Sequence, residues 1–359
     1  MMLQKDVSVD YDICVIGGGP VGLFSAIESC LAGLKTCVFE PQNGVIDKAC
    51  GEGLMPNAVK MLQDIGVHPD AHHPFKGIKY IDDNASAEGL FPNGVGWGIR
   101  RLQLHQALLK RIEELQIPIF HQKVQNFQDH QTYVQVENIT ARYVLAADGL
   151  HSSIRKKLGL NTTAKFPPRL GLRQHYHIAP WSDFVEVYWS QFGECYVTPV
   201  DETQIGVAIL VYKDHKISGS SEESFEQMLN WFPKLQTKLK GLTASSTIRG
   251  AGTFEHRAKK PGLGNIFLVG DASGYLDPIT GEGLRLGFAS AKVAIQAISH
   301  SKIPLRQYCI QHQQTVKHYW ISTGFLLKLR QITVFRRMMI PFLRLFPAIF
   351  SLILKKLSL

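Results

Sequence analysis

A glycine-rich turn near the N-terminus is the feature that most restricts how this chain can fold. Residues 11–16 end in an apolar run, and Gly17-Gly18-Gly19-Pro20-Val21-Gly22 follows with the spacing G-x-G-x-x-G. Between a strand and a helix, the first glycine permits the tight turn, the second lets a pyrophosphate approach the backbone, and the third allows close helix packing. The start of the helix would offer N–H groups and a partial positive charge to the phosphates. The turn therefore predicts a dinucleotide-binding unit.

An acidic residue stands where such a unit needs one. Residues 35–39 are typical of a second buried strand, and Glu40 follows as the expected partner of a ribose hydroxyl. A G-x-G-x-x-G alone also fits an ordinary glycine-rich turn, but its place between a strand and a helix, with Glu40 beyond, favours dinucleotide binding. The sequence has no second G-x-G-x-x-G, so another nucleotide would bind only transiently.

Composition places the chain among globular proteins. Of its 359 residues, 45% are hydrophobic and 19% are charged, and the length suits two closely joined domains. The first ten residues are polar and lack the apolar core of a signal peptide, which predicts a cytoplasmic location. The six cysteines show no C-x-x-C spacing, so we expect small buried side chains and no metal site.

Periodicity predicts the elements that surround the first unit. Helices are expected at 56–66, at 100–115 and at 283–298, and strands at 119–124, 132–137, 143–147 and 265–269. Loops and turns are expected at 42–53 and 82–98. Residues 169–211 instead alternate as in an antiparallel sheet with one covered face, and a helix at 223–235 should end near Pro233.

Two further turns follow predicted strands, at the edge where α/β sheets bind ligands. Asp148-Gly149 follows one strand and Gly270-Asp271 another, and the carboxylate of Asp271 could accept hydrogen bonds from a sugar-like polyol. The helix expected at residue 283 has a glycine-rich start, Gly281-Glu282-Gly283, whose N–H groups suit a carbonyl that gains negative charge.

The order of these motifs resembles that of the single-component flavoprotein monooxygenases and the related geranylgeranyl reductases. The resemblance is carried by Gly17-x-Gly19-x-x-Gly22 with Glu40, Arg101-x-x-Leu104, Asp148-Gly149 and Gly270-Asp271, which extend from residue 11 to the end of the helix expected at 283–298. It implies an α/β fold, with a Rossmann-like FAD-binding domain, an inserted antiparallel-sheet substrate domain and a helical C-terminal tail. It also implies that FAD contacts Gly17, Gly19, Pro20, Gly22, Glu40, Arg101, Val124, Asp148, Asp271, Gly281, Gly283 and Leu284.

Each of these residues has an implied place around FAD. The resemblance puts Glu40 on the adenosine ribose, Val124 near the adenine, and residues 281–284 beside the isoalloxazine. Arg101 and Asp271 would lie near the diphosphate and the ribityl chain, while Asp148 is expected to brace the neighbouring turn. Arg100 is the alternative to Arg101 in this role.

The resemblance leaves two reactions open. We expect NAD(P)H to reduce the FAD of a monooxygenase that acts on a phenolic, polyketide or lipid-like substrate. The alternative is a double-bond reductase, because Gly274 stands where hydroxylases commonly have histidine, and C-G-E-G-L at 50–54 resembles a geranylgeranyl reductase motif. A flavin-bound interaction protein without turnover is a third, weaker possibility.

Four side chains are candidates for the substrate pocket: Arg173, His175, Tyr196 and Glu52. For each, a structural explanation competes. Arg173 and His175 alternate with His177 along a predicted strand, and this pattern favours a solvated face. Tyr196 could be an ordinary aromatic residue of the sheet, and Glu52 a surface charge on a loop. The sequence identifies none of them as an essential acid or base.

We expect the chain to divide into three parts. The FAD-binding domain would be discontinuous and comprise residues 1–75, 99–165 and 250–300. Residues 76–98 and 166–249 would form the substrate domain. Residues 301–359 would form a basic, apolar, helical C-terminal region.

Positive charge is concentrated in that last region. Residues 283–359 contain twelve Lys or Arg and no Asp or Glu, whereas the whole chain has a net charge of +9. Within 320–359, charged residues and two prolines interrupt the apolar groups, so no uncharged run reaches the ~18–20 residues that cross a bilayer. We expect short amphipathic helices that hold the protein on an anionic membrane surface, at the inner face of the membrane.

Other interpretations of this region compete with membrane attachment. Its apolar residues could cover the substrate domain as ordinary core. Nucleic acid is not expected as a partner, because the positive residues lie among Leu, Ile and Phe and not in a polar, solvated arm.

Overall fold

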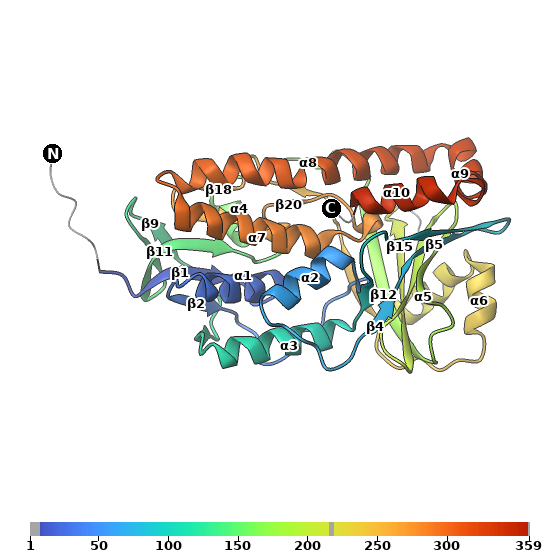
Figure 1. The fold of residues 1–359 in the computed structure, drawn as a ribbon, viewed down its shortest axis with the longest axis horizontal. Coiled ribbons are helices and arrows are strands. Elements are labelled where there is room, and N and C mark those ends of the chain that lie inside the picture. The colour runs from blue at the N-terminus through green and yellow to red at the C-terminus, as the bar shows by residue number, and fades with distance from the viewer. Residues whose placement is uncertain (1–7, 215–218, 358–359) are drawn as a thin grey trace.

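Two large β-sheets and a layer of helices form most of the molecule. The structure is a computed structural model that describes residues 8–214 and 219–357. Figure 1 shows the first sheet towards the N-terminal end of the long axis and the second at the opposite end, with the helix α8 (Pro304–Gln331) running from one to the other. The predicted α/β class is confirmed.

The first sheet has the strand order β18-β19-β11-β1-β2-β8, with a ribbon of β9 and β10 attached to β11. Its parallel core consists of β1 (Tyr11–Ile16), β2 (Thr36–Phe39), β8 (Ile119–Phe120), β11 (Ile139–Ala146) and β19 (Ile266–Leu268). The antiparallel strands are β9 (Phe127–Asp129), β10 (Val134–Val136) and β18 (Gly262–Leu263).

Both faces of this sheet are covered, which explains why its central strands are continuously apolar. Ile13 and Val15 face a cluster with the helices, while Cys14 and Ile16 face a cluster with the ribbon. The helices on the first face are α1 (Pro20–Leu31), α2 (Pro56–Asp64), α3 (Arg101–Glu114) and α7 (Gly283–His300). A short helix, α4 (Ser153–Lys157), follows β11.

The second sheet has seven strands in the order β16-β12-β15-β14-β13-β5-β6. Their bounds are β5 (Gly77–Ile81), β6 (Ser86–Leu90), β12 (Arg169–His177), β13 (Phe184–Trp189), β14 (Gly193–Pro199), β15 (Gln204–Tyr212) and β16 (Arg249–Gly252). All neighbours are antiparallel except β13 and β5. The expected turn region 82–98 contains two strands, because Gly and Asn turns separate short runs that lack a clear apolar pattern; one of them, β6, pairs with the preceding strand β5.

The expectation of one covered face is wrong for this sheet. Every residue of β13 is buried. The helices α5 (Ser221–Leu229) and α6 (Pro233–Leu239) cover one face, and the C-terminal helices cover the other. Pro233 begins α6 and does not end a single helix, since proline is tolerated in the first turn.

Small elements complete the described chain. One three-stranded sheet joins β3 (Gly53–Leu54), β7 (Gly96–Gly98) and β4 (His73–Phe75), and one pair joins β17 (His256–Arg257) and β20 (Gly274–Tyr275). Two 3-10 turns, η1 (Gly270–Ala272) and η2 (Pro278–Thr280), precede α7.

The C-terminal region is helical but is not a set of short helices from residue 320 onwards. Trp320 lies inside α8, which has 28 residues, and α9 (Thr333–Leu345) and α10 (Pro347–Leu357) follow. Both α9 and α10 contact β6, and Ser351 Oγ accepts a hydrogen bond of 3.1 Å from Leu90 N on this edge strand. The competing interpretation, that the apolar residues of this region cover the second sheet as core, therefore holds for its inner side chains.

No single described helix is long and apolar enough to cross a membrane. The pair α9 and α10 has the length and composition, but the two helices are bent by 105° relative to each other.

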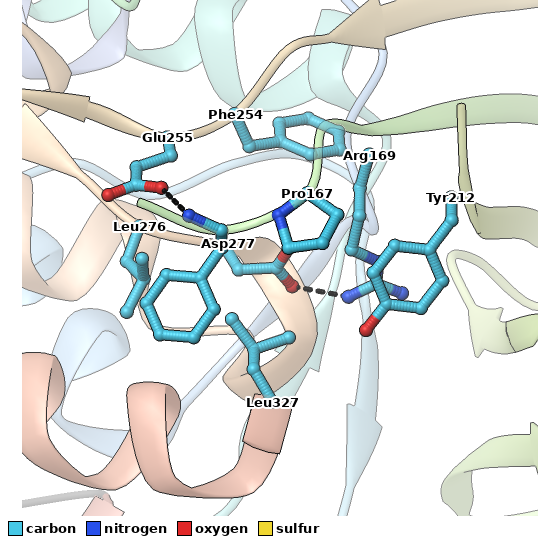
Figure 2. A pocket seen from close by; sticks show the side chains of 9 residues that line it. Pro167, Arg169, Tyr212, Phe254, Glu255, Leu276, Asp277 and Leu327 are labelled. Carbon is cyan, nitrogen blue, oxygen red and sulfur yellow. Dashed lines mark hydrogen bonds and ion pairs between the residues drawn. The ribbon is translucent and has the colours of Figure 1, made fainter. Parts of the chain in front are cut away.

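A buried group of four charges joins the second sheet to the helices. Arg169 on β12 donates to Asp277 at 2.7 Å, and it also pairs with Glu194 on β14. Arg330 of α8 pairs with the other oxygen of Glu194. Figure 2 shows Arg169 and Asp277 meeting beside a pocket that Phe254, Leu276 and Leu327 also line.

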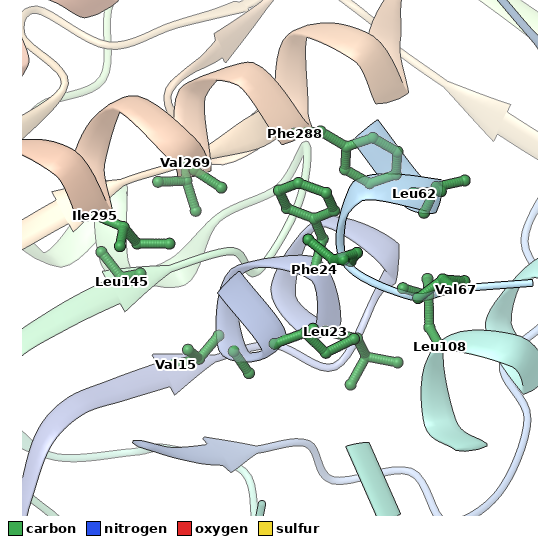
Figure 3. Packing of buried hydrophobic residues seen from close by; sticks show 14 of the residues in the cluster. Val15, Leu23, Phe24, Leu62, Val67, Leu108, Leu145, Val269, Phe288 and Ile295 are labelled. Atoms are coloured by element: carbon green, nitrogen blue, oxygen red, sulfur yellow. The ribbon is translucent and has the colours of Figure 1, made fainter. Parts of the chain in front are cut away.

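The core between the first sheet and its helices depends on two stacked aromatic rings. Phe24 of α1 and Phe288 of α7 lie with centroids 4.5 Å apart and planes at 19°. Figure 3 shows them among Leu23, Leu62 and Val269, where α1, α2 and α7 meet.

We predict that Phe288→Ala lowers the free energy of unfolding by about 3–5 kcal/mol, because a fully buried ring is replaced by a cavity. Denaturant unfolding followed by circular dichroism measures this change. Leu31→Ala at the exposed end of α1 is the control and should change it by about 0.5 kcal/mol. Equal losses in the two variants would contradict this account of the core.

Candidate functional site

Two glycines of the G-x-G-x-x-G turn are required by packing. Gly17 has φ +108°, and a Cβ there would lie 2.6 Å from the carbonyl oxygen of Ala147. A Cβ on Gly22 would lie only 1.7 Å from the oxygen of Gly17. Any side chain at either position would therefore push α1 away from the strands.

Gly19 differs from its two neighbours in the motif. It is the N-cap of α1, with Pro20 as the first helical residue, and a Cβ built on Gly19 meets no atom within 4 Å. The backbone is bare here on the side that faces open space, at the positive end of a helix. This is the place that a phosphate would need.

Glu40 lies beside the same turn, at the end of β2. Its carboxylate accepts hydrogen bonds from Gly18 N at 2.7 Å and from Gln42 N at 2.9 Å. These bonds fix Glu40 next to the glycine turn, as its expected role at a ribose requires.

The two neighbouring arginines at the start of α3 point to different places. Arg100 reaches Gln204 of the second sheet at 3.4 Å. Arg101 lies close enough to Asp271 to favour the ionised form of that carboxyl, and its Nε is buried without a hydrogen-bond partner among the described residues. The geometry favours Arg101 over Arg100 as the residue near the diphosphate.

Asp271 lies in η1, surrounded by positive groups. Burial raises the pKa of Asp271 to about 6, although Arg101, Lys48 and Arg155 act in the opposite direction. A hydroxyl that donates a hydrogen bond to Asp271 would stabilise its ionised form. This is the contact with a sugar-like polyol that the sequence predicts.

Asp148 braces the turn that leads into α4. Its Oδ2 accepts hydrogen bonds from Ser153 Oγ at 3.2 Å and from Ile154 N at 3.1 Å, while its Oδ1 is buried without a partner among the described residues. Val124 is also buried, in the cluster on the ribbon side of the first sheet. The side chain of Val124 is occupied by this packing, so a contact with adenine would come from the backbone.

The turn before α7 carries the remaining residues expected near a flavin. Gly281 has φ +69°, and a Cβ at this position would lie 3.4 Å from Met55 Cε. Gly283 lies against the ring of Tyr275. Leu284 packs on the core of the first sheet. Tyr196 Oη donates to the carbonyl oxygen of Ile279 at 3.0 Å, so the second sheet contacts this turn directly.

Glu52, Arg173 and His175 form a buried network, and two structural explanations for them are wrong. Arg173 and His175 are 1% and 0% exposed, although His177 is exposed, and Glu52 is 4% exposed. The alternation along the strand suggested a solvated face, but it could not reveal what covers that face. The covering residues are Asp47 and Glu52, which come from the distant loop 42–53. Asp47 accepts a hydrogen bond from Arg173 at 2.5 Å.

The tautomer of His175 follows from its partners. Arg173 can only donate, so His175 Nδ1, 3.0 Å away, accepts, and Nε2 carries the proton towards Glu52 Oε2 at 2.6 Å. The other oxygen of Glu52 accepts from Arg101 N at 2.9 Å. The network thus fixes the start of α3, where a negative group is favoured, and it positions Arg101.

Sequence reasoning missed three contributors. His105, one helical turn after Arg101, is bound at Nδ1 by Ile46 N at 3.3 Å and bonds to Gly18 O at 2.7 Å. Arg155 donates to Ala272 O at 2.9 Å, and Tyr319 of α8 accepts from Asp277 N at 3.0 Å. The spacing of Arg101 and His105 on one helix face was a usable signal, whereas Arg155 and Tyr319 depend on long-range contacts.

The turn, the open backbone at Gly19 and the acidic residue after β2 define a dinucleotide-binding α/β protein. The chain belongs to the family described as FAD binding domain, which matches residues 10–300. The buried, unpartnered atoms of Arg101 and Asp148 and the bare turn fit such a cofactor.

Known relatives include enzymes with different reactions. A digeranylgeranylglycerophospholipid reductase from Methanococcus aeolicus is 25% identical, over 88% of this chain and 84% of the relative. An uncharacterized aromatic compound monooxygenase, YhjG from Bacillus subtilis, is 23% identical, over 78% of this chain and 60% of the relative. The solved structure of a flavoprotein/dehydrogenase from Cytophaga hutchinsonii has a TM-score of 0.79 at 20% identity, covering 97% of this chain and 98% of that one.

We predict that Gly19→Val gives a folded protein that does not retain FAD, because the side chain enters the open space at the start of α1. Gly19→Ala should retain a part of the FAD. The flavin absorbance of the purified protein measures FAD occupancy, and circular dichroism measures folding. Gly22→Ala is the matched control: it should disturb the fold itself, because its Cβ overlaps the oxygen of Gly17.

We also predict that Asp271→Ala weakens FAD binding more than Asp148→Ala does, since Asp148 already bonds within its own turn. Loss of a charge-assisted hydrogen bond would cost about 1.5–3 kcal/mol, or about 10- to 150-fold in Kd. Titration of apo-protein with FAD gives both constants. Equal values for the two variants would contradict the assignment.

The variants Asp271→Ala and Asp148→Ala also test how the protonation of Asp271 affects FAD binding. Its pKa is about 6 without ligand, and FAD favours the ionised form, so affinity of the unmodified protein should fall as the pH drops through 6. Asp271→Ala should lose this part of the pH dependence, and Asp148→Ala should keep it.

Proposed function

We propose that the protein is an NAD(P)H-dependent FAD monooxygenase that acts on a hydrophobic substrate, which is phenolic, polyketide or lipid-like. The observation that carries the proposal is the direct contact of the second sheet with the turn that would hold the flavin, where Tyr196 Oη donates to the carbonyl oxygen of Ile279 at 3.0 Å. A small pocket lies immediately before that turn, lined by Phe166, Phe254, Leu276 and Leu327 together with the charged residues Arg169, Glu255 and Asp277 (Figure 2).

The chain's own residues would hold the cofactor along the edge of the first sheet. Gly19 and the start of α1 would receive the diphosphate, Glu40 the ribose, and Asp271 with Arg101 the ribityl chain and diphosphate. The start of α7 at Gly283 would stabilise negative charge on the ring system. Bound FAD would accept hydride from NAD(P)H and supply the oxygen-activating chemistry.

The protein's contribution to monooxygenation would be positioning and the exclusion of water. Met55 and Tyr275 place apolar surface against the turn at Gly281 and Gly283. Tyr196 holds the backbone of that turn through Ile279. These contacts would exclude water from the side of the ring system that faces the second sheet.

Double-bond reduction is the second candidate, and Glu282 is the observation that favours it. A reductase must add a proton to carbon as well as a hydride, and Glu282 lies between the two glycines of the turn. It is 2% exposed, burial raises its pKa, and Arg285 lies 2.5 Å away as an opposing influence. A carboxyl in this environment can hold a proton for transfer.

Two measurements separate the candidates. NADH and NADPH are first added without oxygen, and bleaching of the flavin absorbance is expected with at least one of them. Oxygen is then admitted with an alkylphenol or a polyprenyl lipid, and products are analysed by mass spectrometry. A monooxygenase adds one oxygen atom, whereas a reductase adds two hydrogens without oxygen.

The variant Glu282→Gln sharpens this comparison. It should leave monooxygenation and the bleaching by NAD(P)H within about threefold, but it should abolish double-bond reduction by removing the proton donor. Failure of both nucleotides to bleach the flavin would reject both enzymatic proposals and favour a flavin-bound interaction protein.

A further inference from the structure

Exposed apolar side chains are concentrated in the C-terminal helices. Of the eighteen large apolar residues that are exposed in residues 8–214 and 219–357, eleven lie between Ile321 and Ile353. Four of them, Val334, Met338, Phe342 and Leu345, follow the spacing of one face of α9.

This face of α9 is not the one that packs in the core. Met339, Ile340 and Leu343 occupy the opposite side and are buried against the second sheet. The helix is therefore apolar on two sides, and only one side is covered by the fold. A surface helix of a globular protein ordinarily has a polar outer face.

The neighbouring helices extend the exposed surface. On α10, Ile349, Leu352 and Ile353 are exposed at helical spacing, while Phe350 and Leu354 are buried. On α8, Phe325 is exposed one helical turn before Lys328. We define the docking face as the exposed side chains of residues 321–356.

The charges on the docking face have one sign. Lys328, Arg337, Arg344 and Lys356 are all exposed, and residues 283–359 contain no carboxylate side chain. Within residues 8–214 and 219–357, none of these four side chains lies within salt-bridge distance of a carboxylate. Apolar groups bordered by cations that no carboxylate neutralises suit a partner surface with an apolar interior and a negatively charged outer layer.

We propose that the docking face holds the protein reversibly on an anionic lipid membrane. A second copy of the chain is a poorer occupant, because a two-fold contact would bring the same cations together. Spanning is disfavoured, since the inner side chains of α9 and α10 belong to the core and the helices are bent by 105°. Both helices would lie in the interface, with their outer apolar side chains among the acyl chains.

Removing residues 320–359 is not a clean test. Arg330 pairs with the buried Glu194, and Leu327, Ile340 and Phe350 belong to the core, so the truncated chain would carry an unpaired charge and exposed core. Substitutions on the outer face avoid this problem.

The experiment is co-sedimentation of the intact FAD-loaded protein with vesicles of phosphatidylcholine, with or without phosphatidylglycerol. One variant combines Met338→Gln, Phe342→Gln and Leu345→Gln, and it should lose binding to both vesicles by on the order of tenfold or more. A second combines Arg337→Gln and Arg344→Gln, and it should lose roughly 20- to 30-fold, only on the anionic vesicles. Ile310→Gln and Arg306→Gln, exposed on the other end of α8, are the matched controls and should bind as the unmodified protein does.

Thermal unfolding and retained flavin verify that every variant is folded. The proposal is overturned if the unmodified protein stays in the supernatant with anionic vesicles at low salt, or if both outer-face variants bind as it does. A change from dimer to monomer in the apolar variant, without vesicle binding by the unmodified protein, would assign the face to a second copy and also reject the proposal. None of these outcomes depends on the reaction that the enzyme catalyses.

Discussion

Four buried charges hold the parts of this molecule together. Arg169, Glu194, Asp277 and Arg330 come from two strands, the turn before α7, and α8. Their charges sum to zero, and each carboxylate contacts an arginine, so the cost of burial is offset only while the whole group is present. Because Asp277 belongs to the turn that would hold the flavin, the group fixes the position of the second sheet relative to the cofactor site.

The position of the strand-end turns in the first sheet could be predicted from the sequence because its signals are local. The glycine turn, Glu40, and the turns after β11 and β19 each lie at the end of a strand, where the topology of a parallel sheet brings them to one edge. Short sequence patterns therefore predicted that these turns lie at one edge of the sheet without knowledge of distant contacts. Arg100 and Arg101 remained equivalent in the sequence, since only the packing of α3 decides which of them faces Asp271.

The substrate half could not be predicted in the same way. Glu52 and His175 are 123 residues apart, and the alternation along β12 reveals two faces but not what covers them. The strand β6 was hidden among turn residues, because its pairing with β5 and its contacts with α9 and α10 replace the missing apolar pattern. The C-terminal helices were similarly ambiguous. They carry apolar side chains on two sides, and in the sequence these residues form one long mixture with the basic ones. Only the position of the second sheet shows which side is buried.

The length of α8 has a mechanical consequence. Its 28 residues extend about 42 Å at the ordinary helical rise, and along this length one stripe of side chains contacts both halves of the molecule. Tyr308 donates to Leu268 of the first sheet, His312 bonds to Ser273, and Arg330 pairs with Glu194 of the second sheet. A rod attached at both ends opposes hinge bending between the sheets. Entry and exit of a large substrate would therefore require movement of loops or partial lifting of the helix, and not the opening of two domains like a jaw.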